Sequence, residues 1–291
     1  METSEIFGGV EAQYALLANA VAVVISVPYD QTSTWGKGAD KGPAAIIEAS
    51  ANMELYDIET DTEIYKKGFY TAEAVTEKSS PEAMVEAVEK SADNYLKQKK
   101  FLVGLGGEHS VTTGFVRACA RHFDNLSVLQ LDAHTDLRPE YQGSPYSHAS
   151  VMSRVREICP FVQVGIRSMD IIEKPFLVDE NLFLAEDIYD NDDWMDDAVD
   201  QLTENVFITI DLDVFDPSIM PSTGTPEPGG LYWYQVIKFL RRVVEEKNVV
   251  GFDVVELAPV DDNKAPDFLA AKLVYKLLTY KFQEQAARAI K

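Results

Sequence analysis

The chain has 291 residues, of which 46% are hydrophobic and 25% charged, and this composition excludes a disordered or fibrous protein. Lys and Arg total 26 against 48 Asp and Glu, and the resulting net charge of −22 argues against a nucleic acid or an anionic membrane as a partner. The same charge favours a cationic small ligand, and a simple gain in solubility is the alternative explanation.

Short apolar runs alternate with segments of helical spacing along the whole chain. The runs are rich in Val and Ile and have the length of strands that are buried on both faces. In chain order they cover residues 19–27, 101–107, 126–133, 161–167, 182–187, 206–214 and 249–259. Helical spacing is found in residues 81–98, 110–122, 149–158, 192–204, 232–246 and 266–286. This alternation predicts an α/β fold with a mostly parallel central sheet flanked by helices.

We expect one domain over residues 1–291, because no linker rich in Gly, Ser or Pro divides the chain. Cys119 and Cys159 are the only cysteines, and their spacing suggests neither a disulfide framework nor a metal knuckle. The amino end lacks the basic and apolar regions of a signal peptide, and no apolar stretch has the length of a membrane span. These features predict a cytoplasmic protein with no membrane partner.

Two of the predicted strands end in acidic clusters. Residues 132–136 read Asp-Ala-His-Thr-Asp, and residues 211–213 read Asp-Leu-Asp. If the chain stays extended, alternation places Asp132, His134 and Asp136 on one side. Asp211 and Asp213 share a side for the same reason. Buried carboxylates at this density require a cationic partner, so the pattern predicts a site for two divalent metal ions.

Two more polar residues follow predicted strands. His109 comes after the strand at 101–107, and together with the acidic clusters it predicts a further metal ligand, whereas alone it would fit a hydrogen-bonded structural role. Glu256 lies near the end of the strand at 249–259, and a carboxylate there can bind a planar guanidinium through two parallel hydrogen bonds. A structural ion pair is the alternative for Glu256, and a turn is the alternative for residues 211–213 alone.

The predicted ligands are rich in oxygen with a minority of imidazole, a set that suits Mn²⁺ better than a thiophilic ion. Two such ions about 3.5–4 Å apart lower the pKa of a bound water and present hydroxide at neutral pH. The predicted reaction class is therefore metal-assisted hydrolysis.

At this point the motifs resemble the ureohydrolases, the family of arginases and agmatinases, over nearly the whole chain. The matching segments are residues 28–46 (PYDQTSTWGKGADKGPAAI), 106–110 (GGEHS), 131–136 (LDAHTD), 147–150 (SHAS), 210–218 (IDLDVFDPS), 222–230 (STGTPEPGG) and 253–259 (DVVELAP). The resemblance implies a three-layer α/β/α sandwich around a parallel sheet. It also implies two Mn²⁺ per subunit and a homo-oligomer, which in this family is a trimer, tetramer or hexamer.

Carried over by motif, the resemblance assigns a role to each candidate residue. The first metal would be held by His109, Asp132, Asp136 and Asp211. The second would be held by Asp132, His134, Asp211 and Asp213. Catalysis would rest on Asp136, which orients the nucleophile, on Glu256, which holds the guanidinium, and on His148, which passes a proton to the departing amine. The implied substrate-binding residues are His148, Thr225, Glu256 and Asp170.

The segment from Leu137 to Ser147 carries the choice of substrate. It lacks the Asn positions that receive the α-carboxylate in arginases and looks similar to agmatinases, so we expect agmatine to be cleaved to putrescine and urea. Arginine, guanidinobutyrate, guanidinopropionate and formiminoglutamate are the alternatives. Arg138 in this segment has the chemistry to receive a carboxylate, but we expect it to face solvent or another subunit. Asp170 matches a position that contacts the α-amine in arginases.

Two other classes of protein remain as alternatives. A metal-dependent phosphoesterase uses a similar cluster of Asp and His, but it brings basic or Asn groups for phosphate, and few of the motif segments are basic. A non-catalytic paralogue of the ureohydrolases would be expected to lack metal ligands, and every expected ligand is present in this chain.

Overall fold

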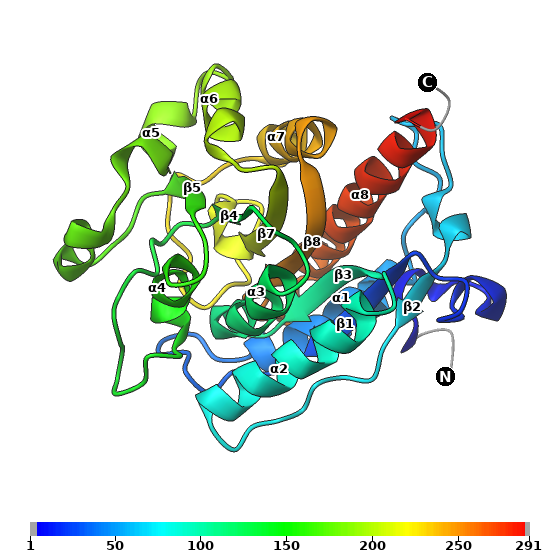
Figure 1. Cartoon of the computed structure of the whole chain (residues 1–291), viewed down its shortest axis with the longest axis horizontal. Helices are drawn as coiled ribbons and strands as arrows, with labels where there is room; N and C mark the ends of the chain where they lie inside the picture. Colours follow the sequence, from blue (N-terminus) through cyan, green and yellow to red (C-terminus); the bar gives the residue numbers. More distant parts are fainter. Residues whose placement is uncertain (1–4, 289–291) are drawn as a thin grey trace.

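The computed structural model describes residues 5–288, and its centre is an eight-stranded sheet (Figure 1). The strand order is β2-β1-β3-β8-β7-β4-β5-β6, and every neighbouring pair is parallel. The strands are β1 (Ala22–Val27), β2 (Phe69–Thr71), β3 (Phe101–Gly106), β4 (Leu126–Leu131), β5 (Phe161–Ile166), β6 (Leu182–Leu184), β7 (Asn205–Asp211) and β8 (Asn248–Val255). The predicted α/β fold with a parallel sheet is confirmed.

Helices cover both faces of this sheet, which gives three layers (Figure 1). They are α1 (Gly42–Ser50), α2 (Pro81–Leu96), α3 (Thr112–Ala120), α4 (Val151–Arg156), α5 (Ala185–Ile188), α6 (Trp194–Gln201), α7 (Trp233–Glu246) and α8 (Ala265–Arg288). One hydrophobic core lies beneath α1, α5, α6, α7 and α8, and a second lies beneath α2, α3 and α4. In β7, Val206 and Ile208 enter the first core and Phe207 enters the second, because successive side chains of a strand point to opposite faces.

Three elements differ from the sequence prediction. The short strand β2 and the helix α1 were not predicted, and the run at 182–187 is a strand only as far as Leu184 before it turns into α5. Strand β2 has three residues, too few to show a period, and α1 is built largely from small residues that give it little amphipathic contrast. Pairing with β1 and burial against the sheet stabilise these elements, and neither contact is encoded locally.

Four adjacent strands position the candidate site. In the order β3-β8-β7-β4 they run parallel, so their carboxyl ends meet at the same edge of the sheet. The register pairs Leu131 with Ile210 and Asp211 with Val255, which brings the ends of β4, β7 and β8 level with one another. The candidate residues at or just after these ends are His109, Asp132, Asp211 and Glu256.

The turn after β3 depends on a close approach of two backbones. The N–H of Gly107 donates to the carbonyl of Val27, and the N–H of Glu108 donates to the carbonyl of Tyr29, each over 2.8 Å. A Cβ on Gly107 would lie 1.9 Å from the carbonyl oxygen of Tyr29. Only glycine allows this approach, so the turn that leads to His109 requires it.

Gly107→Ala is therefore expected to lower the free energy of unfolding by about 3 kcal/mol, because the added methyl forces the two backbones apart. Urea denaturation followed by circular dichroism measures this change. Gly143→Ala is the matched control: its Cβ would have no atom within 4 Å, and only its φ of +82° is unfavourable, so about 1 kcal/mol is expected. Equal losses in the two variants would contradict the steric explanation.

Candidate active site

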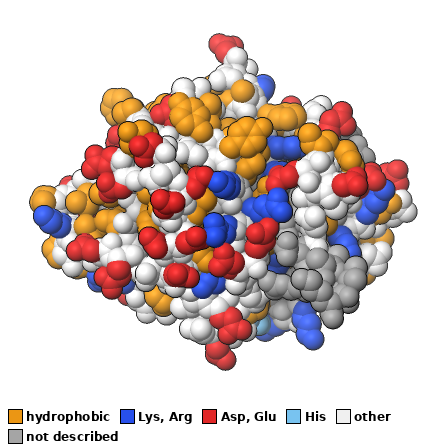
Figure 2. Space-filling model, turned by 90° about the horizontal axis from the view of Figure 1, so that it is seen from above, with side chains coloured by type: hydrophobic (Ala, Val, Ile, Leu, Met, Phe, Trp, Pro, Cys, Tyr) orange, Lys and Arg blue, Asp and Glu red, His pale blue; other side chains and the backbone are white. Residues whose placement is uncertain are grey.

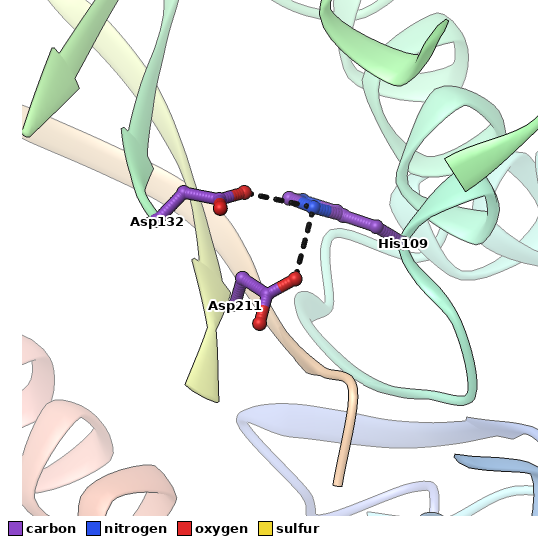
Figure 3. Close-up of side chains that lie close together, drawn as sticks. All are labelled: His109, Asp132 and Asp211. Atoms are coloured by element: carbon purple, nitrogen blue, oxygen red, sulfur yellow. Dashed lines mark ion pairs between the residues drawn. The ribbon is translucent and has the colours of Figure 1, made fainter. Parts of the chain in front are cut away.

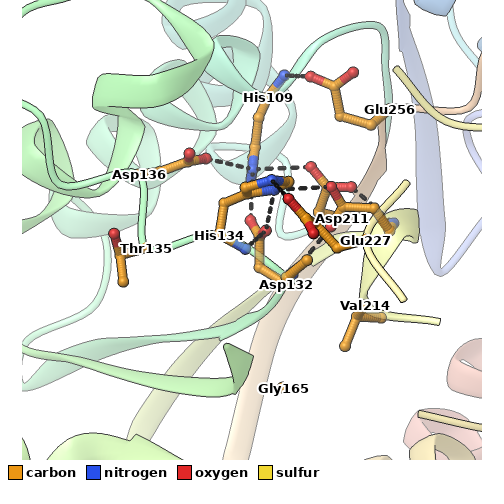
Figure 4. Close-up of polar contacts among 12 residues, drawn as sticks. His109, Asp132, His134, Thr135, Asp136, Gly165, Asp211, Val214, Glu227 and Glu256 are labelled. Carbon is orange, nitrogen blue, oxygen red and sulfur yellow. Dashed lines mark hydrogen bonds and ion pairs between the residues drawn. The ribbon is translucent and has the colours of Figure 1, made fainter. Parts of the chain in front are cut away.

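The first cluster of metal-binding side chains surrounds the imidazole of His109. This residue opens a 3-10 helix (His109–Val111) directly after the turn that follows β3. Its Nδ1 lies 3.1 Å from a carboxylate oxygen of Asp132, 3.1 Å from one of Asp136 and 3.4 Å from one of Asp211 (Figures 3 and 4). On the other side of the ring, Nε2 is 2.8 Å from the hydroxyl of Thr209, which fixes the ring with Nδ1 towards the carboxylates.

The second cluster surrounds His134 and shares Asp132 with the first (Figure 4). The Nδ1 of His134 is 2.9 Å from a carboxylate oxygen of Asp213 and 3.6 Å from one of Asp132. The potential ligand atoms of His109, Asp132 and Asp211 lie within 4.8 Å of one another, and so do those of Asp132, His134 and Asp213. The structure therefore brings together all six predicted metal ligands and places His109 and His134 in separate clusters.

The two acidic segments are held by the same kind of turn. The carboxylate of Asp132 accepts a hydrogen bond from the N–H of His134 over 2.6 Å, and that of Asp211 accepts one from the N–H of Asp213 over 2.9 Å. An Asp side chain that bonds the backbone two residues later forms an Asx-type turn. Each strand end is thus bent by the same carboxylate that faces the cluster.

The predicted reason for the convergence, alternation along an extended chain, is wrong for both segments. Strand β4 ends at Leu131, and Asp136 has a φ of +51°, in the left-handed region. Asp213 lies in a 3-10 helix (Leu212–Val214). The carbonyl of Asp136 accepts a hydrogen bond from the N–H of Met152, so contact with α4 bends this loop back over the site.

The four carboxylates of these clusters form ion pairs with only two imidazoles within residues 5–288. Burial raises the pKa of Asp211 well above its usual value, and the neighbouring Asp213 and Asp132 raise it further. Burial and Asp132 also raise the pKa of Asp136 to about 7. Burial works against the charged form of His134, but the carboxylates of Asp213 and Asp132 raise its pKa to about 12. This surplus of negative charge on an oxygen-rich donor set fits two divalent ions.

A cavity of about 310 Å³ opens over the two clusters. The candidate residues that line it are His109, His134, Asp136, His148, Asp170, Asp211, Asp213, Thr225 and Glu256. Asp132 lies beneath, with no exposed surface. All the residues that the sequence suggested for the site therefore converge on this cavity or its floor.

Glu256 lies at the wall of the cavity. One of its carboxylate oxygens accepts a hydrogen bond of 2.9 Å from the N–H of His109 (Figure 4). Within residues 5–288 it forms no ion pair, so a structural ion pair does not explain its position. Burial, together with the nearby Glu108, raises the pKa of Glu256 well above its usual value. A cationic group in the cavity would relieve this cost.

Arg138 was expected to face solvent or another subunit, and the structure places it in the lining of the cavity with 25% of its side chain exposed. Its guanidinium lies 3.3 Å from a carboxylate oxygen of Asp170 and 3.5 Å from one of Glu173. It also stacks over the ring of Tyr141 at 4.5 Å. The two carboxylates and the ring draw this side chain inwards. Asp170 and Glu173 lie more than 30 residues away in the sequence, so the local sequence pattern around Arg138 could not predict these contacts.

The sequence interpretation missed several residues that support the ligands. Gln130 donates a hydrogen bond of 2.7 Å to Asp132, Thr209 holds His109, and Glu227 lies 3.8 Å from the Nε2 of His134. Gln130 and Thr209 are fully buried polar residues with apolar neighbours on both sides in largely apolar strands. A buried polar side chain needs a hydrogen-bond partner, so a polar residue inside a predicted buried strand could have indicated a residue that supports the ligands.

Asp213→Asn is expected to reduce the number of bound metal ions, because a neutral amide replaces a charged ligand of the second cluster. Metal content after equilibration with Mn²⁺ and desalting measures this directly, with the exposed Asp200→Asn as the control. In the parent protein, Mn²⁺ at 100 times its dissociation constant should add about 2.7 kcal/mol to the free energy of unfolding. Unchanged metal content in Asp213→Asn would rule out this ligand set.

Comparison with known proteins places this geometry in a family. The family model described as the arginase family matches residues 20–279. The chain is 40% identical to an N(1)-aminopropylagmatine ureohydrolase of Synechocystis sp. over 90% of each chain, and 33% identical to an agmatinase of Pyrococcus horikoshii over 90% of this chain and 92% of the other. The agmatine ureohydrolase of Thermoplasma volcanium superposes with a TM-score of 0.85, at 29% identity over 95% of each chain. The chain therefore belongs to the arginase family.

Proposed function

We propose that this protein is a manganese-dependent ureohydrolase that cleaves a guanidino compound with a cationic tail, and that agmatine is cleaved to putrescine and urea. The observation that carries the proposal is the pairing of a dinuclear donor set with Glu256, a buried carboxylate that has no basic partner within residues 5–288. A guanidinium bound at Glu256 would lie beside both clusters.

The chain's own residues supply the remaining chemistry. Two divalent ions, held by the six ligands, would lower the pKa of a bound water and so provide a nucleophile at neutral pH. Asp136 would orient the nucleophilic water through a hydrogen bond, and Glu256 would hold the guanidinium. His148 would pass a proton to the departing amine. Burial, reinforced by the imidazoles of His109 and His134, lowers the pKa of His148 to about 4, so its ring is neutral at pH 7.

The surroundings of Arg138 support an amine rather than a carboxylate at the far end of the substrate. Its positive charge is matched by Asp170 and Glu173, and the three side chains together carry one negative charge. A substrate carboxylate would therefore meet a region that is already anionic, whereas an ammonium group would be attracted to it. This argues against guanidinobutyrate and for agmatine.

N(1)-aminopropylagmatine is a second candidate substrate. Relatives from Synechocystis sp. and Thermus thermophilus that are 40% identical carry that activity in their names, while the agmatinase of Pyrococcus horikoshii is 33% identical. Both compounds combine a guanidinium with a cationic tail, so both suit a cavity with an anionic far end. The rival phosphoesterase is disfavoured, because among the described residues Arg138 is the only Lys or Arg that lines the cavity, and its charge is already paired.

The expected order of substrates follows from these charges. Agmatine and N(1)-aminopropylagmatine should be hydrolysed with kcat/KM about 100-fold above guanidinobutyrate, arginine, guanidinopropionate and formiminoglutamate, as measured by urea release in the presence of Mn²⁺. A higher kcat/KM for a substrate that carries a carboxylate would contradict the proposal that the substrate has a cationic tail. Absence of urea with every compound, together with phosphate release from simple esters, would overturn the ureohydrolase itself.

Asp170→Asn should reduce the preference for a substrate with a cationic tail over one with a carboxylate. It removes one of the two carboxylates that neutralise Arg138, so the ratio of kcat/KM for agmatine to that for guanidinobutyrate is expected to fall about 10-fold. The matched control is Glu140→Gln, an exposed carboxylate in the same loop as Arg138. A ratio that stays constant in Asp170→Asn would show that this charge cluster does not select the substrate.

We also propose that the chain forms a single domain, works in the cytoplasm and assembles into a trimer, tetramer or hexamer. Large apolar side chains that are exposed support assembly: Ile58 is 87% exposed, Trp35 83% and Tyr234 80%. Figure 2 shows hydrophobic side chains grouped beside mixed acidic and basic ones on one face. Among residues 5–288, no helix is long and apolar enough to cross a membrane.

A further inference from the structure

The guanidinium of Arg167 is surrounded by backbone carbonyls. Arg167 directly follows β5 and is partly buried. Its nitrogen atoms lie within hydrogen-bond distance of the carbonyl oxygens of Asp213 at 2.6 Å, Glu227 at 2.8 Å, Gly165 and Pro228 at 3.1 Å, Phe215 at 3.4 Å and Val214 at 3.5 Å. Within residues 5–288 it forms no ion pair, so a surface salt bridge does not explain its position. The carbonyls belong to three segments: the end of β5, residues 213–215 and residues 227–228.

The shape of this side chain limits how those segments can move. A guanidinium has five N–H donors in one fixed plane and no acceptor. Because the donors cannot move relative to one another, the carbonyls that share them are held at a fixed spacing. The two shortest bonds, to Asp213 and Glu227, start from the same atom, Nη2. The side chain of Arg167 therefore fixes the backbone of residues 213–215 against that of residues 227–228.

The backbone of Arg167 holds the other segment that supplies the second cluster. Its N–H donates to the carbonyl of Ala133 over 2.8 Å, and Ala133 lies between the ligands Asp132 and His134. The N–H of Ala133 in turn donates to the carboxylate of Asp213 over 3.0 Å. One residue thus contacts both acidic segments, through its backbone in one case and through its side chain in the other.

The imidazole of His134 lies between two carboxylates whose backbones Arg167 holds. Its Nδ1 is 2.9 Å from a carboxylate oxygen of Asp213, and its Nε2 is 3.8 Å from one of Glu227 (Figure 4). The carbonyls of these two acidic residues are the ones that accept the short bonds from Nη2. The guanidinium therefore sets the spacing of the acidic groups on either side of the ring.

We propose that Arg167 is a positioning residue for the second cluster, where it holds Asp213 and Glu227 in place around His134. The inference rests on the proposed function, in which two divalent ions bind. Within residues 5–288 Arg167 forms no hydrogen bond with the ligands that belong to the first cluster alone. Loss of its side chain should therefore weaken the binding of the second ion and leave that of the first nearly unchanged.

Metal binding tests this inference without turnover. Arg167→Met keeps an unbranched side chain but removes every donor, and we expect its affinity for the second ion to fall about 100-fold. Arg167→Lys keeps one nitrogen with three donors, so a loss of about 10-fold is expected. Isothermal titration of the metal-free protein with Mn²⁺ measures both binding steps. Arg121→Met, at an exposed arginine at the end of α3, is the matched control and should bind both ions as the parent protein does.

Electron paramagnetic resonance separates positioning from folding. Two adjacent Mn²⁺ ions are magnetically coupled, whereas an isolated ion gives a resolved hyperfine spectrum. At a Mn²⁺ concentration that just fills both sites of the parent protein, we expect a coupled spectrum from the parent and the spectrum of an isolated ion from Arg167→Met. A general loss of structure would release both ions together and would change the circular dichroism of the protein.

The double variant Arg167→Met/Asp213→Asn identifies the cluster that Arg167 affects. Asp213→Asn already removes a ligand of the second ion, so adding Arg167→Met should cause no further loss of bound metal if the arginine acts on that cluster alone. Loss of the remaining ion in the double variant would place the effect on the first cluster and contradict the inference.

Unchanged affinity for the second ion in either Arg167→Met or Arg167→Lys would also overturn the inference, so the test stands even if the methionine variant does not fold. Equal weakening of both ions would do the same, and neither result affects the proposed function. A parent protein that binds no pair of Mn²⁺ ions would instead contradict the proposed function, and the role of Arg167 with it.

Discussion

The structure depends on one electrostatic constraint, the concentration of buried carboxylates at one edge of a parallel sheet. Asp132, Asp136, Asp211 and Asp213 are all buried, and within residues 5–288 two imidazoles are the only basic groups that form ion pairs with their carboxylates. Removing so many negative charges from water is unfavourable unless cations replace the lost solvation. The rigid sheet holds the carboxylates in this arrangement. If separate loops carried them, the loops would move apart and reduce the electrostatic repulsion.

The neighbouring elements limit how these side chains can relax. Asx-type turns bend both acidic segments, Thr209 orients His109, and Gln130 holds Asp132 from below. A site built in this way is shaped before a metal arrives, so less conformational entropy is lost on binding.

A second part of the cavity lining surrounds Arg138. Its guanidinium lies against the carboxylates of Asp170 and Glu173 and stacks on Tyr141, so the charge of Arg138 is more than matched within the protein. Glu256 has no ion-pair partner within residues 5–288, and the group of Arg138, Asp170 and Glu173 retains one negative charge. A ligand with a cation at both ends is complementary to such a cavity. The excess of negative charge beside the metal centre and around Arg138 therefore favours the same kind of substrate.

The sequence patterns by themselves determined the fold class, most of the strands and helices, the two acidic clusters, His109 and Glu256, whereas His148, Thr225 and Asp170 came from the resemblance to the ureohydrolases. These are local properties: buried strands show as apolar runs rich in Val and Ile, helices show their period, and the acidic clusters stand at strand ends. The sequence did not determine β2 or α1, whose residues carry too little periodic signal. It also predicted the wrong local path for Asp136 and Asp213.

The tertiary structure alone decided which charges are compensated. Arg138 turns inwards because Asp170 and Glu173, from a distant segment, approach it, and Thr32 reaches His148 across 116 residues. Asp136 adopts a left-handed backbone because its carbonyl is held by α4. Contacts of this kind arise from packing between elements, so they cannot be predicted from the spacing of residues along the chain. The chemical type of each ligand, in contrast, is given directly by the sequence.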